Sequence, residues 1–385
     1  MKKNEILSNS LIWTGAAISI AEIITGTFIA PLGFYKGLLA ILLGHVIGGA
    51  LLFLAGIIGA ATNKCSMETT AYSFGKRGSI FFALLNVIQL FGWTGIMIYD
   101  GAQAAQGIFN IPFFVICLII AALIILWIIV GIENIGKISI VAVTSLALLS
   151  LVLAKLIFSN QTEGAFSFEE ISFGTALELS IAMPLSWLPL ISDYTKNSEK
   201  KIAVPLFSAL TYTVISIFMY TIGMGAAIFT GEANIVQILL KAGLGTIALV
   251  IVILSTVTTT FMDAWSAGIS LKTIFEKVDV KIAAIITAVT GGIAAIFFPL
   301  DNITNFLYFI GSVFAPMTAI LIADFFIVKK DSSEKRISIT KSLIWVAGFI
   351  LYRVLMKYDL IIGCTIPDML FTMAITVIAG KLLRF

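Results

Sequence analysis

The chain has 385 residues, of which 59% are hydrophobic and only 12% are charged, and its net charge is +3. Soluble domains carry about 25% charged residues, so this composition excludes a soluble globular protein. The apolar residues fall in blocks that match the length needed to span a bilayer, roughly 20 residues. These features predict an all-α polytopic membrane protein that is embedded in the lipid bilayer.

Hydropathy and turn residues predict twelve transmembrane helices. In chain order they are 11–31, 37–61, 79–107, 112–131, 135–158, 173–193, 203–229, 244–271, 281–299, 302–328, 338–355 and 366–383. The first block follows Lys2 and Lys3, but eleven more blocks favour a transmembrane helix over a cleaved signal peptide. In the second span, Gly44 and Gly48 form a small-residue face that suits close helix packing.

Lysine and arginine residues gather on one side of this topology. With the N-terminus inside, the cytoplasmic segments hold 19 of them and the outer segments hold five. Cytoplasmic loops carry an excess of positive charge, so both termini are predicted to lie in the cytoplasm and the protein in the inner (cytoplasmic) membrane. The loops are short, and neither a nucleic acid nor an obligatory protein partner is expected.

The few cysteines and the single histidine limit the chemistry that the chain can carry. Cys65, Cys117 and Cys364 are isolated, and no Cys/His ligand spacing occurs. Disulfides, redox chemistry and a protein-built zinc site are therefore not expected. An intramembrane enzyme would need a pattern such as HExxH or a Ser–His pair, which the sequence does not offer. The chain is predicted not to be an enzyme.

Ionisable residues inside membrane spans are costly, and they usually face a cavity or a partner. Seven stand out here: Glu22, His45, Asp100, Glu178, Asp193, Asp263 and Asp324. Asp193 and Asp324 lie beside lysines at the predicted cytoplasmic ends, where a solvated charge or an ion pair explains them. Glu178 lies near the outer start of its span, and His45 is expected to be a core histidine bonded to backbone. The other three lie deeper.

One face of the third span combines polar and aromatic side chains. Gln89, Trp93, Met97 and Asp100 follow helical spacing. An indole beside hydrogen-bonding groups suits a flat, polar heterocycle. The alternative is that Trp93 is a packing residue, while Gln89 and Asp100 bond to other helices. Whether Asp100 has a structural or a proton-coupling role also stays open.

The eighth span places three hydroxyl groups on one helical turn, those of Ser255, Thr258 and Thr259. Hydroxyl and carbonyl oxygens are hard ligands that suit a small alkali cation. Such hydroxyls can also bond back to their own helix, so the triplet gains weight only if a broken helix faces it.

The sixth span, IAMPLSWLPLISDYTK, contains two prolines five residues apart, Pro184 and Pro189. Each lacks an N–H and frees a carbonyl four residues earlier. Unpaired backbone at membrane depth is tolerated where it lines a cavity, and many secondary transporters break one helix in each half of an inverted repeat. The counterpart is the first span, WTGAAISIAEIITG, where Gly15 and Ser19 allow unwinding. Its carbonyls are predicted to face the hydroxyls of the eighth span around one cation.

Four segments together resemble one transporter family: QLFGWTG, MPLSWLPLISDYTK, STVTTTFMDAWSAG and APMTAILIADFF. The chain resembles the nucleobase:cation symporter-1 family, and within it the hydroxymethylpyrimidine permeases of the CytX type. The resemblance implies a leucine-transporter-type fold, with inverted repeats at 1–158 and 173–328 and two extra C-terminal spans at 338–385.

The resemblance also implies site residues. Trp93 matches the tryptophan on which the substrate ring stacks, and Met183, Pro184 and Ser186 match sixth-span contacts. Pro184 stands where relatives carry an aromatic residue, so Trp187 is a candidate for the second ring. The implied sodium ligands are Gly15, Ser19 or Ile18, Ser255, Thr258 and Thr259.

Asp263 lies one turn beyond Thr259, near where relatives carry amides. Our hypothesis is that Asp263 or Glu22 recognises an aminopyrimidine, with Gln89 also on the binding face. A carboxyl group can accept an exocyclic N–H and pair with a ring nitrogen.

The predicted function is cation-coupled uptake of a pyrimidine, with hydroxymethylpyrimidine, a thiamine precursor, as cargo. Cytosine or another nucleobase is the alternative cargo. An amino-acid carrier of the same fold would want a glycine-rich break that MPLSWLP does not provide, and a passive channel is disfavoured by the two breaks. No cofactor is expected. Sodium is the predicted coupling ion, and the deep carboxyl groups leave proton coupling open.

Overall fold

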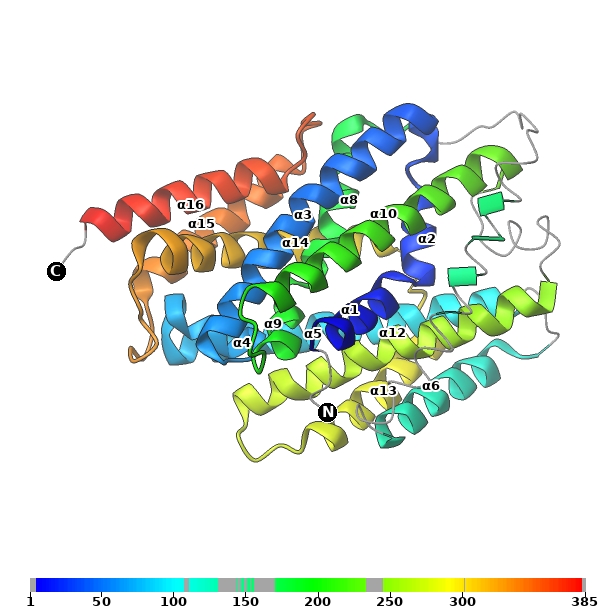
Figure 1. Cartoon of the computed structure of the whole chain (residues 1–385), viewed down its shortest axis with the longest axis horizontal. Helices are drawn as coiled ribbons and strands as arrows, with labels where there is room; N and C mark the ends of the chain where they lie inside the picture. Colours follow the sequence, from blue (N-terminus) through cyan, green and yellow to red (C-terminus); the bar gives the residue numbers. More distant parts are fainter. Residues whose placement is uncertain are drawn as a thin grey trace.

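The computed structural model describes residues 5–106, 111–130, 170–232, 245–300 and 302–382, with a few single positions between 144 and 155. Every regular element in these ranges is a helix (Figure 1). Eight described helices are long and apolar enough to cross a membrane, and the bent pair α1–α2 would be a ninth. The predicted fifth span, 135–158, lies almost entirely outside the described residues, so the count of twelve and the inverted repeat stay predictions.

The helix bounds follow the hydropathy boundaries within a few residues at most ends. They are α1 Glu5–Ala17, α2 Ile20–Thr27, η1 Ala30–Leu32, α3 Phe34–Thr62, α4 Ser66–Thr69, α5 Ala71–Gln106, α6 Phe113–Val130, α8 Phe173–Ser186, α9 Leu188–Thr195, α10 Ala203–Thr230, α12 Gly245–Ile274, α13 Val280–Phe297, α14 Ile303–Ile322, η2 Ala323–Val328, α15 Ile339–Leu355 and α16 Thr365–Leu382. The first and third spans begin earlier than predicted, at residues 5 and 71.

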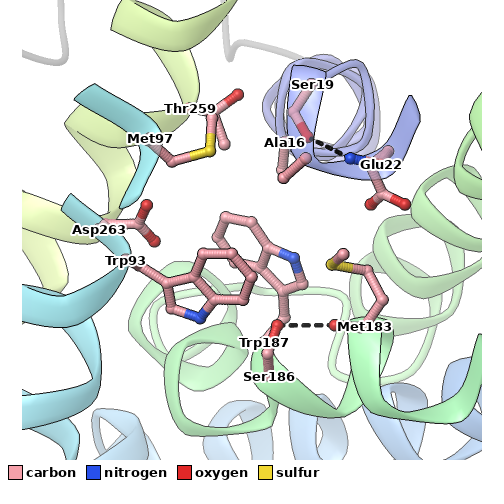
Figure 2. Close-up of a pocket in the computed structure, with 11 residues that line it drawn as sticks. Ala16, Ser19, Glu22, Trp93, Met97, Met183, Ser186, Trp187, Thr259 and Asp263 are labelled. Atoms are coloured by element: carbon pink, nitrogen blue, oxygen red, sulfur yellow. Dashed lines mark hydrogen bonds between the residues drawn. The ribbon is translucent and has the colours of Figure 1, made fainter. Parts of the chain in front are cut away.

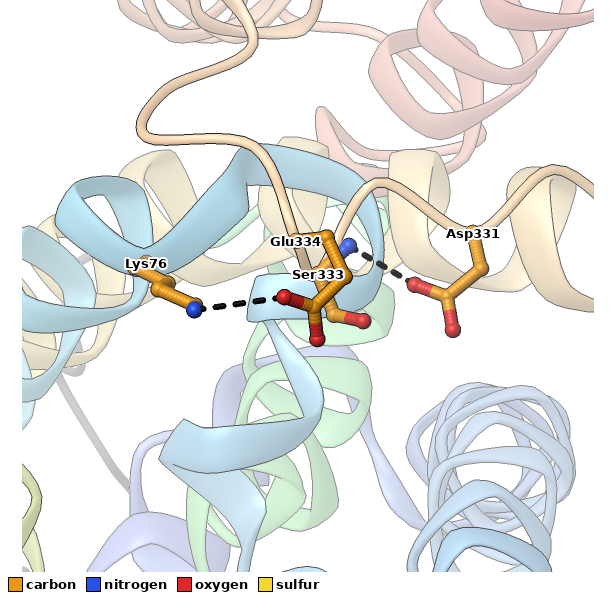
Figure 3. A network of polar contacts seen from close by, with 4 residues as sticks. All are labelled: Lys76, Asp331, Ser333 and Glu334. Atoms are coloured by element: carbon orange, nitrogen blue, oxygen red, sulfur yellow. Dashed lines mark hydrogen bonds and ion pairs between the residues drawn. The ribbon is translucent and has the colours of Figure 1, made fainter.

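The early start of α5 includes a kink at Gly75, whose φ of 76° favours glycine. A Cβ at this position would lie 2.7 Å from the carbonyl oxygen of Lys335. Lys76 donates its N–H to that carbonyl at 3.0 Å, and its Nζ lies 3.3 Å from the carboxylate of Glu334 (Figure 3). The kink therefore brings the backbone of α5 close enough to hydrogen-bond to loop 329–338.

The described helices pack as two main groups with a third attached. One group contains α1, α2, α3, α8, α9 and α10, and the other contains α5, α6, α12 and α13. Helices α14 to α16 pack on one another and on α8. The two main groups meet mainly where α1 and α2 approach α12 and α5. Within the first group, a Cβ at Gly48 would lie 2.3 Å from the Pro184 side chain, which accounts for the small-residue face of the second span.

The first span is broken in its middle. Helices α1 and α2 meet at an angle of 48°. Ser19 adopts an extended conformation, and its Oγ accepts the N–H of Glu22 at 3.3 Å, which caps α2. Because the N–H of Ser19 turns to the carbonyl of Ala17, the carbonyl of Gly15 has no partner in its own helix.

The break in the sixth span is milder than its two prolines predict. Trp187 separates α8 from α9 but keeps nearly helical angles, φ −90° and ψ −8°. Pro189 lies in the first turn of α9, where a missing N–H removes no helical bond. The N–H groups of Leu190 and Ile191 both donate to the carbonyl of Trp187. This leaves the carbonyl of Ser186 without a helical donor.

Candidate functional site

A small cavity lies between the two breaks and the α5–α12 pair (Figure 2). Its lining residues are Ala16, Ser19, Ala21, Glu22, Trp93, Met97, Met183, Ser186, Trp187, Thr259 and Asp263. The cavity volume is about 20 Å³, enough for about one water molecule. A pyrimidine ring can therefore bind only after the surrounding helices move apart.

Most residues predicted to bind substrate line this cavity. They are Glu22, Trp93, Met183, Ser186, Trp187 and Asp263. The two other predicted residues, Gln89 and Pro184, are not among the lining residues, since Pro184 packs against Gly48 and Gln89 turns to the sixth-span backbone. The lining also includes Met97, which lies on the predicted face of the third span. Ala16 and Ala21 line the cavity as well, but a methyl side chain gives no indication of a binding site in a sequence.

Gln89 supports the break rather than the cavity. Its Nε2 donates to the carbonyl of Ser186 at 2.7 Å, and Asn86 donates to the carbonyl of Pro189 at 3.2 Å. The Gln89 amide thus replaces the helical hydrogen bond that Ser186 loses at the break, and the Asn86 amide adds a second contact between α5 and α9. This corresponds to the alternative in which Gln89 bonds to another helix, while Trp93 on the same face lines the cavity.

Two indole rings border the cavity, those of Trp93 and Trp187 (Figure 2). Trp93 packs edge-to-face on Phe306, with ring centroids 5.3 Å apart. Trp187 packs in the same manner on Trp13 at 5.6 Å and on Tyr212 at 6.0 Å. Edge-to-face contacts of this kind stabilise ring orientation. Both indoles are held in place before a ligand arrives.

Two carboxyl groups reach the cavity from opposite groups of helices, Asp263 from α12 and Glu22 from α2. Glu22 accepts a hydrogen bond from Tyr212 at 2.7 Å and contacts the Ser216 hydroxyl at 2.6 Å. Ser216 in turn lies 2.7 Å from His45 Nε2. Asp263 is buried and lies one turn after Thr259 on the same helix.

The chain of contacts from Glu22 to His45 holds a single titratable proton. His45 Nδ1 is 2.9 Å from the carbonyl of Ile41, which only accepts, so Nδ1 carries a hydrogen. The Ser216 hydroxyl has one hydrogen to donate. If it donates to Glu22, then His45 Nε2 must donate to it, and if it donates to His45, then Glu22 must be protonated. Either way, one proton is shared between the carboxyl and the imidazole.

The break in the first span faces the hydroxyl groups of α12. Ser255 donates to the carbonyl of Ile18 at 2.8 Å, and Thr259 donates to the carbonyl of Gly15 at 3.3 Å. These four oxygens are neutral and hard, and two of them are carbonyls freed by the break. A small alkali cation fits this donor set.

One predicted ligand of this cation is oriented elsewhere, because the hydroxyl of Thr258 donates to the carbonyl of Ser255 at 2.9 Å in its own helix. Of the two alternatives predicted for the second first-span carbonyl, Ser19 or Ile18, it is the carbonyl of Ile18 that meets Ser255. No group of three or more His, Cys, Asp and Glu side chains that could hold a metal ion occurs in the part of the chain that the structure describes.

Two further intramembrane carboxyl groups, those of Asp324 and Asp193, make contacts that stabilise the fold. Asp324 forms an ion pair at 2.6 Å, with Lys341 rather than with the neighbouring Lys329. Asp193 accepts the N–H of Ser66 at 2.9 Å. Asp100 is half-buried near the end of α5 and is not among the residues that line the cavity.

Broken helices around a central cavity are typical of secondary transporters. A family model described as a permease for cytosine/purines, uracil, thiamine and allantoin matches residues 2–342. The chain belongs to this permease family and is a multi-pass membrane transporter. The predicted membership of a nucleobase transporter family is confirmed.

Proteins similar to this chain in sequence or in fold are transporters. The cytosine permease of Escherichia coli strain K12 is 22% identical over 348 residues, which cover 89% of this chain and 83% of that protein. The nucleobase-cation-symport-1 family transporter Mhp1, in a closed conformation with bromovinylhydantoin bound, superposes with a TM-score of 0.82 at 18% identity, covering 97% of this chain and 91% of that one. A Na⁺-coupled sialic acid symporter gives a TM-score of 0.75 at 12% identity, covering 98% and 89%. The fold is that of Mhp1.

Proposed function

We propose that this protein is a sodium-coupled importer of an aminopyrimidine, with hydroxymethylpyrimidine as its cargo. The observation that carries the proposal is the cavity itself, where two fixed indoles meet two carboxyl groups beside the freed carbonyls of the first span. Cytosine is the alternative cargo, because the related permeases of Escherichia coli carry that name and the family description includes cytosine and thiamine.

The lining groups match the chemistry of an aminopyrimidine. A flat aromatic ring stacks on indole, and aromatic stacking of a base contributes about 1–3 kcal/mol. Asp263 or Glu22 accepts the exocyclic amino hydrogen and pairs with a ring nitrogen. Such a site rejects analogues that lack the amino group, because a buried carboxyl group would then be left without a partner.

Sodium coupling is supported by the four oxygens of Gly15, Ile18, Ser255 and Thr259. They belong to both main groups of helices, so a cation bound to them holds α1 against α12. Thr259 also lines the cavity, which makes the ion site and the cargo site adjoin.

Proton coupling is the second candidate, and it rests on the shared proton between Glu22 and His45. Glu22 lines the cavity, while His45 lies behind it against Ser216. A proton delivered to this pair would change the charge beside the cargo without any metal ion.

Uptake of labelled hydroxymethylpyrimidine into proteoliposomes tests the proposal. A sodium gradient and a proton gradient are imposed separately, and unlabelled cytosine is the competitor. Sodium-driven accumulation that cytosine does not block supports both the ion and the cargo. Accumulation under a proton gradient alone would assign coupling to the Glu22–His45 pair. Absence of uptake of either pyrimidine under both gradients would overturn the proposed cargo.

A further inference from the structure

The last helix, α16, turns a polar face toward the protein interior. Thr365, Asp368, Thr372 and Thr376 are all completely buried. They recur every three or four residues, so they share one side of the helix. The opposite side carries exposed Leu370 and other apolar residues. A buried polar stripe at membrane depth is costly, and neither the cavity nor the cation ligands described above account for it.

The side chain of Asp368 lies in this stripe without a hydrogen-bond partner among the described residues. Neither of its carboxyl oxygens has one among the described residues, and the hydroxyls of Thr372 and Thr376 likewise bond to no described group. An ionised carboxyl group buried without partners carries a large desolvation penalty. A carboxylic acid avoids that penalty and can donate its hydrogen to a neighbouring hydroxyl.

Glu178, on the adjacent helix α8, differs from Asp368 because its carboxyl oxygens accept several hydrogen bonds. It accepts hydrogen bonds from the hydroxyls of Tyr352 and Thr365, at 2.5 and 2.6 Å, and from the N–H groups of Cys364 and Thr365, at 2.7 and 2.9 Å. A like charge nearby disfavours the ionised form of a second carboxyl group in a low dielectric. Glu178 accepts four hydrogen bonds and Asp368 accepts none, so of the two carboxyl groups Asp368 is the one suited to hold a proton.

The helices pack closely beside Asp368, at Gly348 of α15, and such packing is compatible with a bound proton. A Cβ at Gly348 of α15 would lie 2.6 Å from Cβ of Pro316, 2.7 Å from Oγ1 of Thr372 and 3.4 Å from Oδ1 of Asp368. Helices α14, α15 and α16 therefore meet so closely that even one added methyl group would clash. A proton needs no such space.

The stripe runs from Asp368 toward a second, larger cavity beside loop 329–338. Thr372 and Thr376 follow at one-turn intervals, over about 12 Å from Asp368 at 1.5 Å per residue. Nζ of Lys341 lies 3.5 Å from the carbonyl of Thr376 and 2.6 Å from Asp324. Asp324 and Lys341 line a cavity of about 260 Å³, which the first turns of α15 and Gly380 of α16 also border.

We propose that Asp368 is a proton-binding site of this transporter, separate from the cargo cavity, and that it exchanges its proton with water in the 260 Å³ cavity through Thr372 and Thr376. On release, the proton passes from Oδ of Asp368 to water, and a carboxylate remains. The titratable groups around the site are Glu178 on α8, Tyr308 on α14, Tyr352 on α15 and Cys364 before α16, with Lys341 and Asp324 at the cavity end.

Infrared spectroscopy of the full chain in lipid nanodiscs tests this site independently of the cargo. Spectra are recorded from roughly pH 5 to roughly pH 10, where the C=O stretch of a protonated carboxyl group disappears on ionisation. Asp368→Asn should remove one such band. The matched control is Asp359→Asn, at an exposed carboxylate between α15 and α16, and it should leave every band in place.

A second variant keeps the carboxyl group and interrupts the route. Thr372→Val preserves the shape of the side chain, and it should slow hydrogen–deuterium exchange of the Asp368 acid at least several-fold. This measurement stands even if Asp368→Asn does not fold. Spectra that are identical with and without Asp368 would overturn the proposal, as would unchanged exchange in Thr372→Val. Loss of the band on addition of sodium at fixed pH would assign a cation site instead of a proton site.

Discussion

Replacement of Ser255 by alanine should weaken the dependence of transport on sodium. The hydroxyl of Ser255 and the carbonyl of Ile18, 2.8 Å apart, are two of the four oxygens proposed to hold the ion. In the absence of sodium, the variant loses a neutral hydrogen bond, worth about 0.5–1.5 kcal/mol, and with sodium it loses a contact to a charged group, which we take as about 1.5–3 kcal/mol.

The expected effect is the difference between these two losses. Taken at the middle of the two ranges it comes to about 1.2 kcal/mol, and this corresponds to about an eightfold rise in the sodium concentration for half-maximal uptake. Thr259 lies farther from its carbonyl, at 3.3 Å, so Thr259→Ala should produce a smaller rise. The two distances therefore predict that both variants raise the sodium requirement and that Ser255→Ala raises it more than Thr259→Ala does.

Uptake into proteoliposomes at graded sodium concentrations measures this effect. Thr260→Ala is the matched control, because the hydroxyl of Thr260 donates to Thr256 in its own helix at 2.6 Å. Sodium-dependent quenching of tryptophan fluorescence, recorded without cargo, separates ion binding from transport. If Ser255→Ala and Thr260→Ala show the same sodium dependence as the unchanged protein, the assignment of the ion site is incorrect.

Three further variants test other parts of the structure. Trp93→Ala should weaken cargo binding about tenfold or more through lost stacking, measured by equilibrium binding, whereas Trp93→Phe should retain part of the affinity. Asp263→Asn should sharply reduce uptake of aminopyrimidines, and undiminished uptake by a well-expressed variant would contradict its role in recognition. Glu178→Gln should lower stability by at least about 2 kcal/mol, because four donors lose a charged acceptor; thermal unfolding in detergent, with Glu170→Gln at an exposed site as control, measures the loss.

Sequence patterns predicted the described spans and the positions of the two breaks, because apolar length and proline position act within one segment; the sixth-span break is milder than its prolines predict. They predicted less about partners that come from another helix. Gln89 shares a face with Trp93, yet its amide meets a carbonyl of Ser186 that becomes free only through the local geometry at Trp187. Glu178 was expected to be explained by its place near a membrane boundary. Its partners are more than 170 residues away in the chain, so no local pattern reveals them.

The proposed ion site and the proposed cargo cavity are placed so that one can drive the other. The proposed ion site joins carbonyls of the first span to hydroxyls of α12, and the cavity lies between Glu22 and Trp187 on one side and Trp93 and Asp263 on the other. Both sites therefore bridge the same two groups of helices. Each ligand stabilises the arrangement that the other needs, and such coupling is reciprocal. At sodium concentrations below saturation, Ser255→Ala should consequently lower the affinity for cargo although Ser255 is not among the residues that line the cavity. Saturating sodium should restore that affinity, whereas the loss in Trp93→Ala should persist at every sodium concentration. Equal behaviour of the two variants at saturating sodium would show that the sites are not coupled through this interface.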